Sequence, residues 1–431
     1  MTAQNAMGPQ MHSEALRRLS PLERLFDAID QTNGFNFSIA VTFRGNVAHS
    51  GWVAAFAQVQ QRHPFLRASL NRDDLQTPYV QRSESSLIPL TFERRTSSTQ
   101  WQSVMEAQGE EPFAASAAPL VRVNILEDDR GCDLIVTAHH AILDGMGALL
   151  LIRDVLAVLS GERLAPLAMP LAAEDRIEEA RSSAPPQSIM DPQAAEAWQQ
   201  FLATRPPRSF ERHAGTRRPI ISSLRLSPEE TSQLLRSARK QQTTLGAVLL
   251  TALTAAVREL NASLTKSDIR FSIPVDARPY LKNDDDFVLS ISLPQGVCLY
   301  PGTDFWENAR TLRLQLTAFQ SLDGIEAYFG AIRVAMDQNL DATTLIDVVA
   351  KHHGVDITLT NMKHVTFPMI IDGMTVEAVW GPSVSSCIAG CLVLGSATFN
   401  GALHLVYTTY TPLPELLGKL QEILRKACSD A

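Results

Sequence analysis

Two adjacent histidines, His139 and His140, are followed by a three-residue spacer and then by Asp144 and Gly145. The run before them, 134–138, is apolar and predicts a short buried strand. The stretch after them, 146–159, is also apolar and ends at Ser160-Gly161, which is typical of a helix with a glycine stop. The pattern therefore predicts a strand, a loop and a helix, with two imidazoles and a carboxylate on the loop. Loops on such a scaffold commonly carry functional residues, and imidazole is the usual proton shuttle near neutral pH.

The rest of the chain predicts an α/β fold. Ser20-Pro21 and Ser227-Pro228 are each followed by glutamate at the third helical position, which marks helix starts. Alternating apolar residues at 120–126 and the turn at 128–131 predict a hairpin that ends in the histidine pair. Further helices are predicted at 52–62, 244–260, 305–319 and 413–428, one opens at Asp191-Pro192 and carries Trp198 and Phe201, and strands are predicted at 35–43, 269–275, 288–293, 375–380, 391–398 and 403–410.

The segment 165–192, with prolines at 166, 170, 185 and 186, marks the best domain boundary. We therefore expect an N-terminal unit over 1–170, a linker over 171–191 and a C-terminal unit over 192–431, a division that suits a chain of 431 residues.

Charge and cysteine content narrow the class of protein. The formal net charge of −8, with no long Lys/Arg run, argues against general nucleic-acid binding. The five cysteines are odd in number and scattered, which favours a reduced compartment. Residues 1–14 lack the apolar core of a signal peptide, and no stretch reaches the ~18 apolar residues of a membrane span. We expect a soluble, cytoplasmic protein without a membrane span.

The pattern HHxxxDG resembles the active-site signature of the chloramphenicol acetyltransferase-like superfamily, which includes nonribosomal peptide condensation domains and free-standing O-acyltransferases. Two further segments agree: His63-Pro64-Phe65-Leu66-Arg67 is similar to the family's HPxLR segment, and the run ending at Arg278 is similar to its PVxxR segment. The resemblance covers nearly the whole chain, and the order of segments resembles the stand-alone phthiocerol dimycocerosyl transferase type. The DFGWG motif of the plant-type branch is absent from the sequence, which argues against that branch.

The resemblance implies two chloramphenicol acetyltransferase-like subdomains arranged as a V, with a tunnel at their junction. It implies that His140 is the general base, that His139 supports it, and that Asp144 forms an ion pair with Arg278. Gly145 would permit a tight backbone path after Asp144. Asn361, Ser385 and Ser386 would line the tunnel by position, although ordinary strand hydrogen bonding explains them equally well. We expect no metal, since adjacent histidines on extended backbone point to opposite sides.

The implied activity is an acyltransferase of secondary-metabolite, polyketide, nonribosomal peptide or lipid biosynthesis. Its donor would be a phosphopantetheine thioester on an acyl or peptidyl carrier protein, or coenzyme A, and its acceptor a small alcohol or amine. We expect no bound cofactor and a monomeric protein. The alternatives are a catalytically silent condensation-like domain that recruits a partner and, less favoured, an epimerase-type relative, which needs a second acid-base residue. A second pair, His352-His353, has a shorter spacer before Asp356 and no glycine after it, and predicts only a helix end or surface structure.

Overall fold

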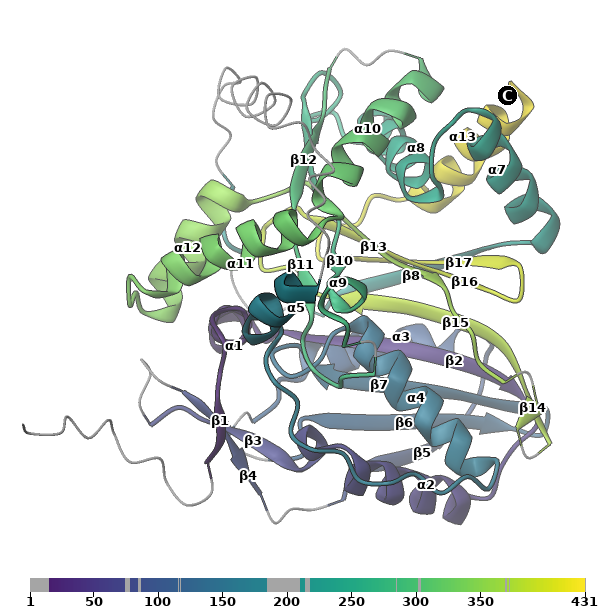
Figure 1. Cartoon of the computed structure of the whole chain (residues 1–431). Helices are drawn as coiled ribbons and strands as arrows, with labels where there is room; N and C mark the ends of the chain where they lie inside the picture. The colour runs from purple at the N-terminus through teal and green to yellow at the C-terminus, as the bar shows by residue number, and fades with distance from the viewer. Residues whose placement is uncertain are drawn as a thin grey trace, which may run out of the picture.

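The computed structural model describes residues 15–73, 78–83, 87–114, 116, 118–183, 210–213, 218–283, 285–300, 304–368, 370–371 and 373–430. Within them, two six-stranded sheets lie one above the other, each with helices on its outer side (Figure 1). The predicted helix opening at Asp191-Pro192, with Trp198 and Phe201, lies outside the described residues.

The first sheet has the strand order β14-β15-β2-β7-β6-β5. The predicted hairpin is its centre, because β6 and β7 pair antiparallel with Asp128 opposite Gly131. Strand β2 runs antiparallel to β7, so Asn36 lies opposite His139 at the end of the strand. The strands are β2 (Asn36–Arg44), β5 (Leu90–Arg94), β6 (Val121–Asp128), β7 (Gly131–His139), β14 (Ile370–Ile371) and β15 (Met374–Val384).

The second sheet has the order β12-β9-β13-β16-β17-β8. The predicted tight turn at Asn400-Gly401 joins β16 to β17, and both residues have positive φ, 46° and 78°, as a type I′ turn requires. The strands are β8 (Ile220–Leu226), β9 (Ile269–Ser272), β12 (Gln295–Cys298), β13 (Ile357–His364), β16 (Leu392–Phe399) and β17 (Ala402–Thr409).

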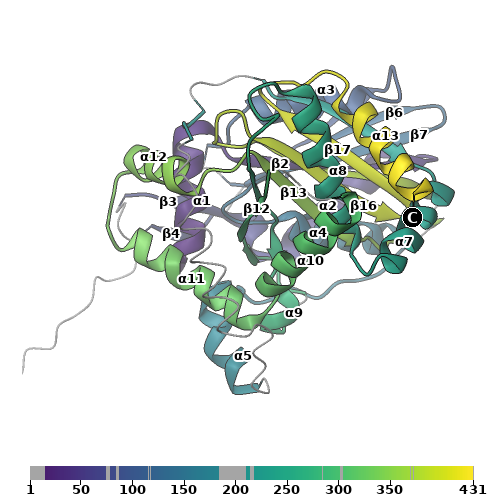
Figure 2. The same cartoon turned by 90° about the horizontal axis from the view of Figure 1, so that it is seen from above.

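Helices cover the sheets on their outer faces, while α3 lies between the sheets. On β2, Ile39 and Val41 pack into the core under α2 and α4, whereas Ala40 points the other way, toward Trp101 of α3. Figure 2 shows α11 and α12 beside α1. The helices are α1 (Pro21–Asn33), α2 (His49–Arg62), α3 (Gln100–Glu110), α4 (Gly145–Leu159), α5 (Ile177–Ser183), α7 (Pro228–Lys240), α8 (Leu245–Leu260), α9 (Arg278–Leu281), α10 (Phe305–Phe319), α11 (Leu322–Met336), α12 (Ala342–His353) and α13 (Leu416–Ser429).

Short elements complete the fold. Both predicted proline-marked helix starts carry a full capping box; at α1, Ser20 Oγ accepts from the Glu23 N–H at 3.3 Å and the Glu23 carboxylate accepts from the Ser20 N–H at 2.9 Å. A small sheet orders its strands β1-β4-β3, and β10 pairs with β11. These elements are β1 (Ala15–Arg18), β3 (Ala68–Asn71), β4 (Tyr79–Arg82), β10 (Val275–Asp276), β11 (Ile291–Ser292) and the 3₁₀ turns η1 (Pro64–Arg67) and η2 (Ala173–Arg176).

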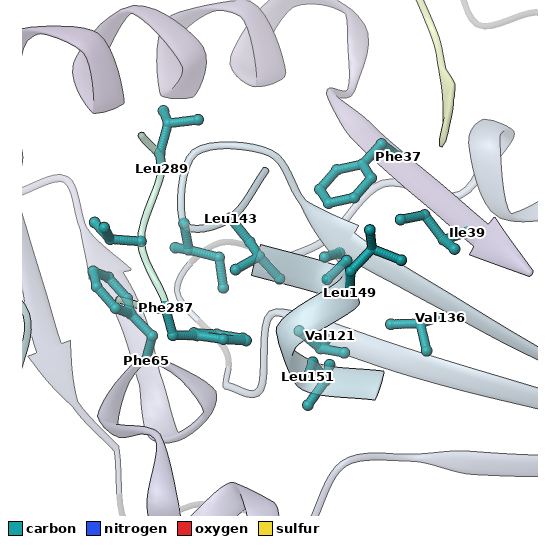
Figure 3. Close-up of a cluster of buried hydrophobic side chains, with 14 of the residues drawn as sticks. Phe37, Ile39, Phe65, Val121, Val136, Leu143, Leu149, Leu151, Phe287 and Leu289 are labelled. Atoms are coloured by element: carbon teal, nitrogen blue, oxygen red, sulfur yellow. The ribbon is translucent and has the colours of Figure 1, made fainter. Parts of the chain in front are cut away.

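Two contacts of the C-terminal half with the N-terminal half go beyond the packing of α11 and α12 on α1. Strands β14 and β15, from the C-terminal half, join the sheet of the N-terminal half. The segment before β11 inserts Phe287 and Leu289 into the N-terminal core beside Phe65 and Leu143 (Figure 3). The division into 1–170, 171–191 and 192–431 stays a prediction, with the addition that 370–384 returns to the first sheet.

Two predicted strands are shorter than the sequence indicates. The strand at 269–275 breaks after Ser272, before Pro274, which has no N–H for a ladder. The strand at 288–293 reduces to Ile291–Ser292. Its first residues are diverted because the Val288 carbonyl and the Ser290 N–H bind side chains instead of a neighbouring strand.

Within the described residues, no helix by itself has the length and apolar content of a membrane span; α7 and α8 pass that test only when joined, across a bend of 101°.

Candidate active site

The histidine pair lies at the end of β7, on the loop that enters α4. The His140 N–H donates to the Phe35 carbonyl of the neighbouring segment at 2.9 Å, and the Ile142 N–H turns back to the His139 carbonyl at 3.3 Å. Asp144 then caps α4, because its Oδ1 accepts from the Gly147 N–H at 2.8 Å. This is the strand, loop and helix arrangement that the sequence predicts.

The His140 ring is enclosed by three aromatic side chains and held in one orientation. Phe35 stacks on it with centroids 4.8 Å apart, Phe26 meets it edge-on at 4.9 Å, and Phe37 lies 4.7 Å away. Nδ1 lies 2.9 Å from the Leu143 carbonyl oxygen. Because a carbonyl only accepts, Nδ1 carries the proton and Nε2 keeps its lone pair in the neutral ring.

Burial determines the charge of this ring. The side chain is 7% exposed, and desolvation lowers the pKa of His140 to about 4, although Asp144 and the Leu143 carbonyl act in the opposite direction. The imidazole is therefore neutral at pH 7, and its Nε2 carries no proton.

His139 has a different environment and different partners. Its Nδ1 accepts from the Ala141 N–H at 3.1 Å, and its Nε2 lies 3.0 Å from Asp30 Oδ2. The ring is fully buried. Among the described residues, no three His, Cys, Asp or Glu side chains come together as a metal site would require.

Asp144 and Arg278 lie together, as the family resemblance implies. Arg278 Nη1 is 2.9 Å from Asp144 Oδ2, and the same oxygen accepts from the Ser290 N–H at 2.8 Å. The remaining guanidinium protons reach the Val288 carbonyl at 2.6 Å and Asp276 Oδ1 at 3.1 Å. Burial acts to lower the pKa of Arg278, but the two carboxylates outweigh it and raise the pKa above its usual range. This buried ion pair connects the histidine motif to the C-terminal half of the chain.

Gly145 has a different role in the packing from the one we expect. Its φ is not among the positive values in the chain, so the backbone needs no glycine there for its path. A Cβ at this position would lie 3.5 Å from Pro382 Cγ and 3.7 Å from Met362 Sδ. Because those residues belong to β15 and β13, the start of α4 packs directly against the C-terminal half.

The three residues assigned to a tunnel by position make local contacts. Asn361 Oδ1 accepts from the Lys363 N–H at 2.8 Å, and Ser386 Oγ accepts from the Ile388 N–H at 3.1 Å. Ser385 is buried just beyond the end of β15. Their role as tunnel residues stays a prediction.

Sequence reasoning missed Asp30 and the three phenylalanines around His140. One signal was available for Asp30: acidic residues at 23, 27 and 30 form a stripe along α1 next to the apolar stripe at 22, 26 and 29, and all six residues are buried. Carboxylates that border the apolar stripe of a helix need partners when they are buried, so their positions indicate a buried polar network.

Comparisons with known proteins place the chain in a family. The model of the condensation domain matches residues 24–288, more than half of the chain. The chain belongs to the condensation-domain family. It is 28% identical over 279 residues to one of the plipastatin synthase subunits of Bacillus subtilis (strain 168), a match that covers 62% of this chain and only 7% of that protein.

Solved structures agree on the fold. The first condensation domain of the calcium-dependent antibiotic synthetase, in complex with a substrate analogue, superposes with a TM-score of 0.70 at 17% identity over 96% of this chain and 97% of that one. Polyketide synthase associated protein 5 from Mycobacterium tuberculosis gives 0.66 at 18% identity, covering 97% and 99%. The predicted two-lobed α/β fold is confirmed, and family membership supports a transferase activity in general.

Proposed function

We propose that this protein is an acyltransferase that moves an acyl group from a thioester to an alcohol or amine, with His140 as the general base. The observation that carries the proposal is the state of the His140 ring: Nδ1 is fixed on the Leu143 carbonyl, and burial holds the pKa near 4, so Nε2 is free to accept a proton at pH 7.

The chemistry follows from that nitrogen. An acceptor hydroxyl or amine attacks the thioester carbonyl while Nε2 removes its proton, and a C–O or C–N bond forms in a tetrahedral oxyanion. The oxyanion collapses, the C–S bond breaks, and the imidazolium returns the proton to the leaving thiolate. No covalent acyl-enzyme is needed. Asp144 and Arg278 hold the loop in place and His139 supports it from the core side.

The donor we propose is a phosphopantetheine thioester on an acyl or peptidyl carrier protein, with coenzyme A as the other source of the same thioester chemistry. Family membership supports this, because condensation domains of peptide synthetases work with carrier domains. The chain spans less than a tenth of the plipastatin synthase polypeptide that it matches, so that protein's activity is not carried over. Monomeric state and a cytoplasmic location stay predictions.

A single-turnover assay tests the proposal. Enzyme in excess over an acyl-thioester mimic and a panel of alcohols and amines should release thiol and form ester or amide with wild-type protein. His140→Ala should release little, while circular dichroism shows that the variant stays folded. If the folded wild type transfers nothing from any carrier-bound, coenzyme A or small thioester donor, the alternative of a silent partner-recruiting domain replaces this one.

A further inference from the structure

Asp30 lies on the buried face of α1, and each of its two carboxylate oxygens contacts a segment that forms the His140 site. Oδ1 accepts from the Phe35 N–H at 2.8 Å. Oδ2 lies 3.0 Å from His139 Nε2 and 3.3 Å from Arg72 Nη2. The residue is 9% exposed. A carboxylate so placed stays ionised only because of these donors; burial raises the pKa of Asp30, and His139, the Phe35 N–H and Arg72 together bring it below its usual range.

The contact of Asp30 with the Phe35 N–H acts on one side of the His140 ring. Phe35 stacks on the imidazole at 4.8 Å, and its carbonyl accepts from the His140 N–H at 2.9 Å. By holding the Phe35 N–H, Asp30 fixes the residue that contacts both the ring and the backbone of His140.

The contact of Asp30 with His139 acts on the other side of the His140 ring. His139 Nδ1 accepts from the Ala141 N–H, so the ring proton is on Nε2, which lies 3.0 Å from Asp30 Oδ2. Ala141 belongs to the turn that ends at Leu143, whose carbonyl holds His140 Nδ1. Asp30 therefore sets the His139 tautomer that this turn needs.

We infer that Asp30 is a positioning residue of the active site, which fixes the orientation and tautomer of His140 from both sides through Phe35 and His139. The inference rests on the proposed function where it concerns catalysis. Its structural content, the state of the His140 ring, is measurable without any activity.

Asparagine cannot replace this carboxylate. Phe35 N–H, His139 Nε2–H and Arg72 are all donors, whereas an amide offers one acceptor oxygen and a donor NH₂. In Asp30→Asn one donor must therefore face the NH₂, and either the Phe35 contact or the His139 tautomer is lost.

Asp27→Asn is the matched control. Asp27 lies one turn earlier on α1, is also buried, and also binds Arg72, with Nε 3.1 Å from Oδ2. The same oxygen accepts from the Gln31 side chain at 3.0 Å, and Gln31 lies on α1 itself. Both variants remove a buried carboxylate from Arg72, and only Asp30→Asn reaches His140.

The experiment combines ¹⁵N NMR of histidine-labelled protein with kinetics on a small acyl-thioester mimic. The chain has 10 histidines, so His139→Ala and His140→Ala assign the two ring signals. We expect both Asp variants to lower the melting temperature, and only Asp30→Asn to change the His140 ring signals. Asp30→Asn should also lower kcat by about 10- to 100-fold with little change in KM, because small misplacement of a catalytic group costs up to ~10² in rate.

The outcomes separate the inference from the proposed function. Unchanged His140 ring signals in folded Asp30→Asn overturn the inference, as do equal changes in Asp27→Asn. Altered ring signals together with full turnover in His140→Ala leave the positioning role standing and remove the general base. If Asp30→Asn does not fold, Asp30→Glu keeps the charge for Arg72 while its extra methylene displaces both oxygens, and the same ring signals decide.

Discussion

The chain contains two His-His pairs that are each followed by an aspartate, and the structure gives them different environments. His139 and His140 are buried at the end of β7. His352 and His353 are exposed at the C-terminal end of α12, where the His353 carbonyl accepts from the Gln295 side chain. The same two residue types therefore lie on a buried strand-to-helix connection in one case and at an exposed helix terminus in the other.

The aspartates explain the difference. Asp144 caps α4 with one oxygen and binds the buried guanidinium of Arg278 with the other. Asp356 is also buried, but its carboxylate accepts from the Arg270 backbone N–H at 2.9 Å at the start of the second sheet. Only the first aspartate fixes a loop between a strand and a helix, so the spacing to a helix-capping, ion-paired carboxylate identifies the site better than the histidines do.

The largest contrast between the pairs should appear in activity. His140→Ala is expected to reduce acyl transfer by ~10²–10⁴-fold, the usual contribution of a general base. His353→Ala should leave turnover within about twofold, because an exposed helix-end side chain contributes little. Rates on one thioester substrate, with circular dichroism to confirm folding, compare the two. Equal losses would remove the distinction between the pairs.

The two aspartates should differ next, in stability. Asp144→Asn keeps the helix cap, because asparagine is a good N-cap residue, but it removes the negative charge that pairs with Arg278. Breaking a buried pair costs about 3–5 kcal/mol, and Asp276 at 3.1 Å places the expected loss toward the lower end. Asp356→Asn retains an oxygen for the Arg270 N–H and should cost about 1 kcal/mol. Urea unfolding measures both, and a smaller loss for Asp144→Asn than for Asp356→Asn contradicts the structural role of the ion pair.

These contrasts also show what the sequence can predict. The hairpin into His139 and the helix after Gly145 follow from local patterns, whereas the pairing of Asp144 with Arg278 is implied by the resemblance to the family's HHxxxDG and PVxxR segments. Asp30 and Phe35 could not be placed beside the histidines, because their contacts depend on how α1 packs against a loop about 100 residues away. The strand predicted at 288–293 is wrong over 288–290 for a related reason. The Val288 carbonyl and the Ser290 N–H bind the side chains of the Asp144–Arg278 ion pair, and the spacing of apolar residues does not reveal such contacts.

The environment of His140 also predicts its pH dependence. An exposed imidazole with a pKa near 6.5 is about nine-tenths protonated at pH 5.5 and is then a poor base. Since the pKa of His140 is about 4, it stays neutral at pH 5.5, and kcat/KM should be lost only as the pH falls toward 4. Its contribution to folding has the same direction: the unfolded histidine takes up a proton below about 6.5 and the folded one does not, so stability declines from there toward pH 4. Half-loss of kcat/KM near pH 6.5, with a substrate that does not titrate, would contradict the buried, neutral state of the ring.

The smallest expected effect distinguishes the two thioester sources rather than the two histidine pairs. Carrier proteins are acidic, and this chain has a formal net charge of −8, so their long-range interaction is repulsive. Productive docking of a carrier then needs a local basic patch, and contacts between exposed charges are screened over ~8–10 Å at physiological salt.

Transfer from a carrier-bound donor should therefore fall several-fold between about 50 and 500 mM salt, whereas transfer from a small thioester mimic should change little, because His140 and its buried partners are shielded from the same ions. Measuring kcat/KM for both donors on one salt series, with His353→Ala as a surface control, separates docking from chemistry. If both donors respond equally, charge-guided carrier docking is wrong, and coenzyme A becomes the better donor for this site.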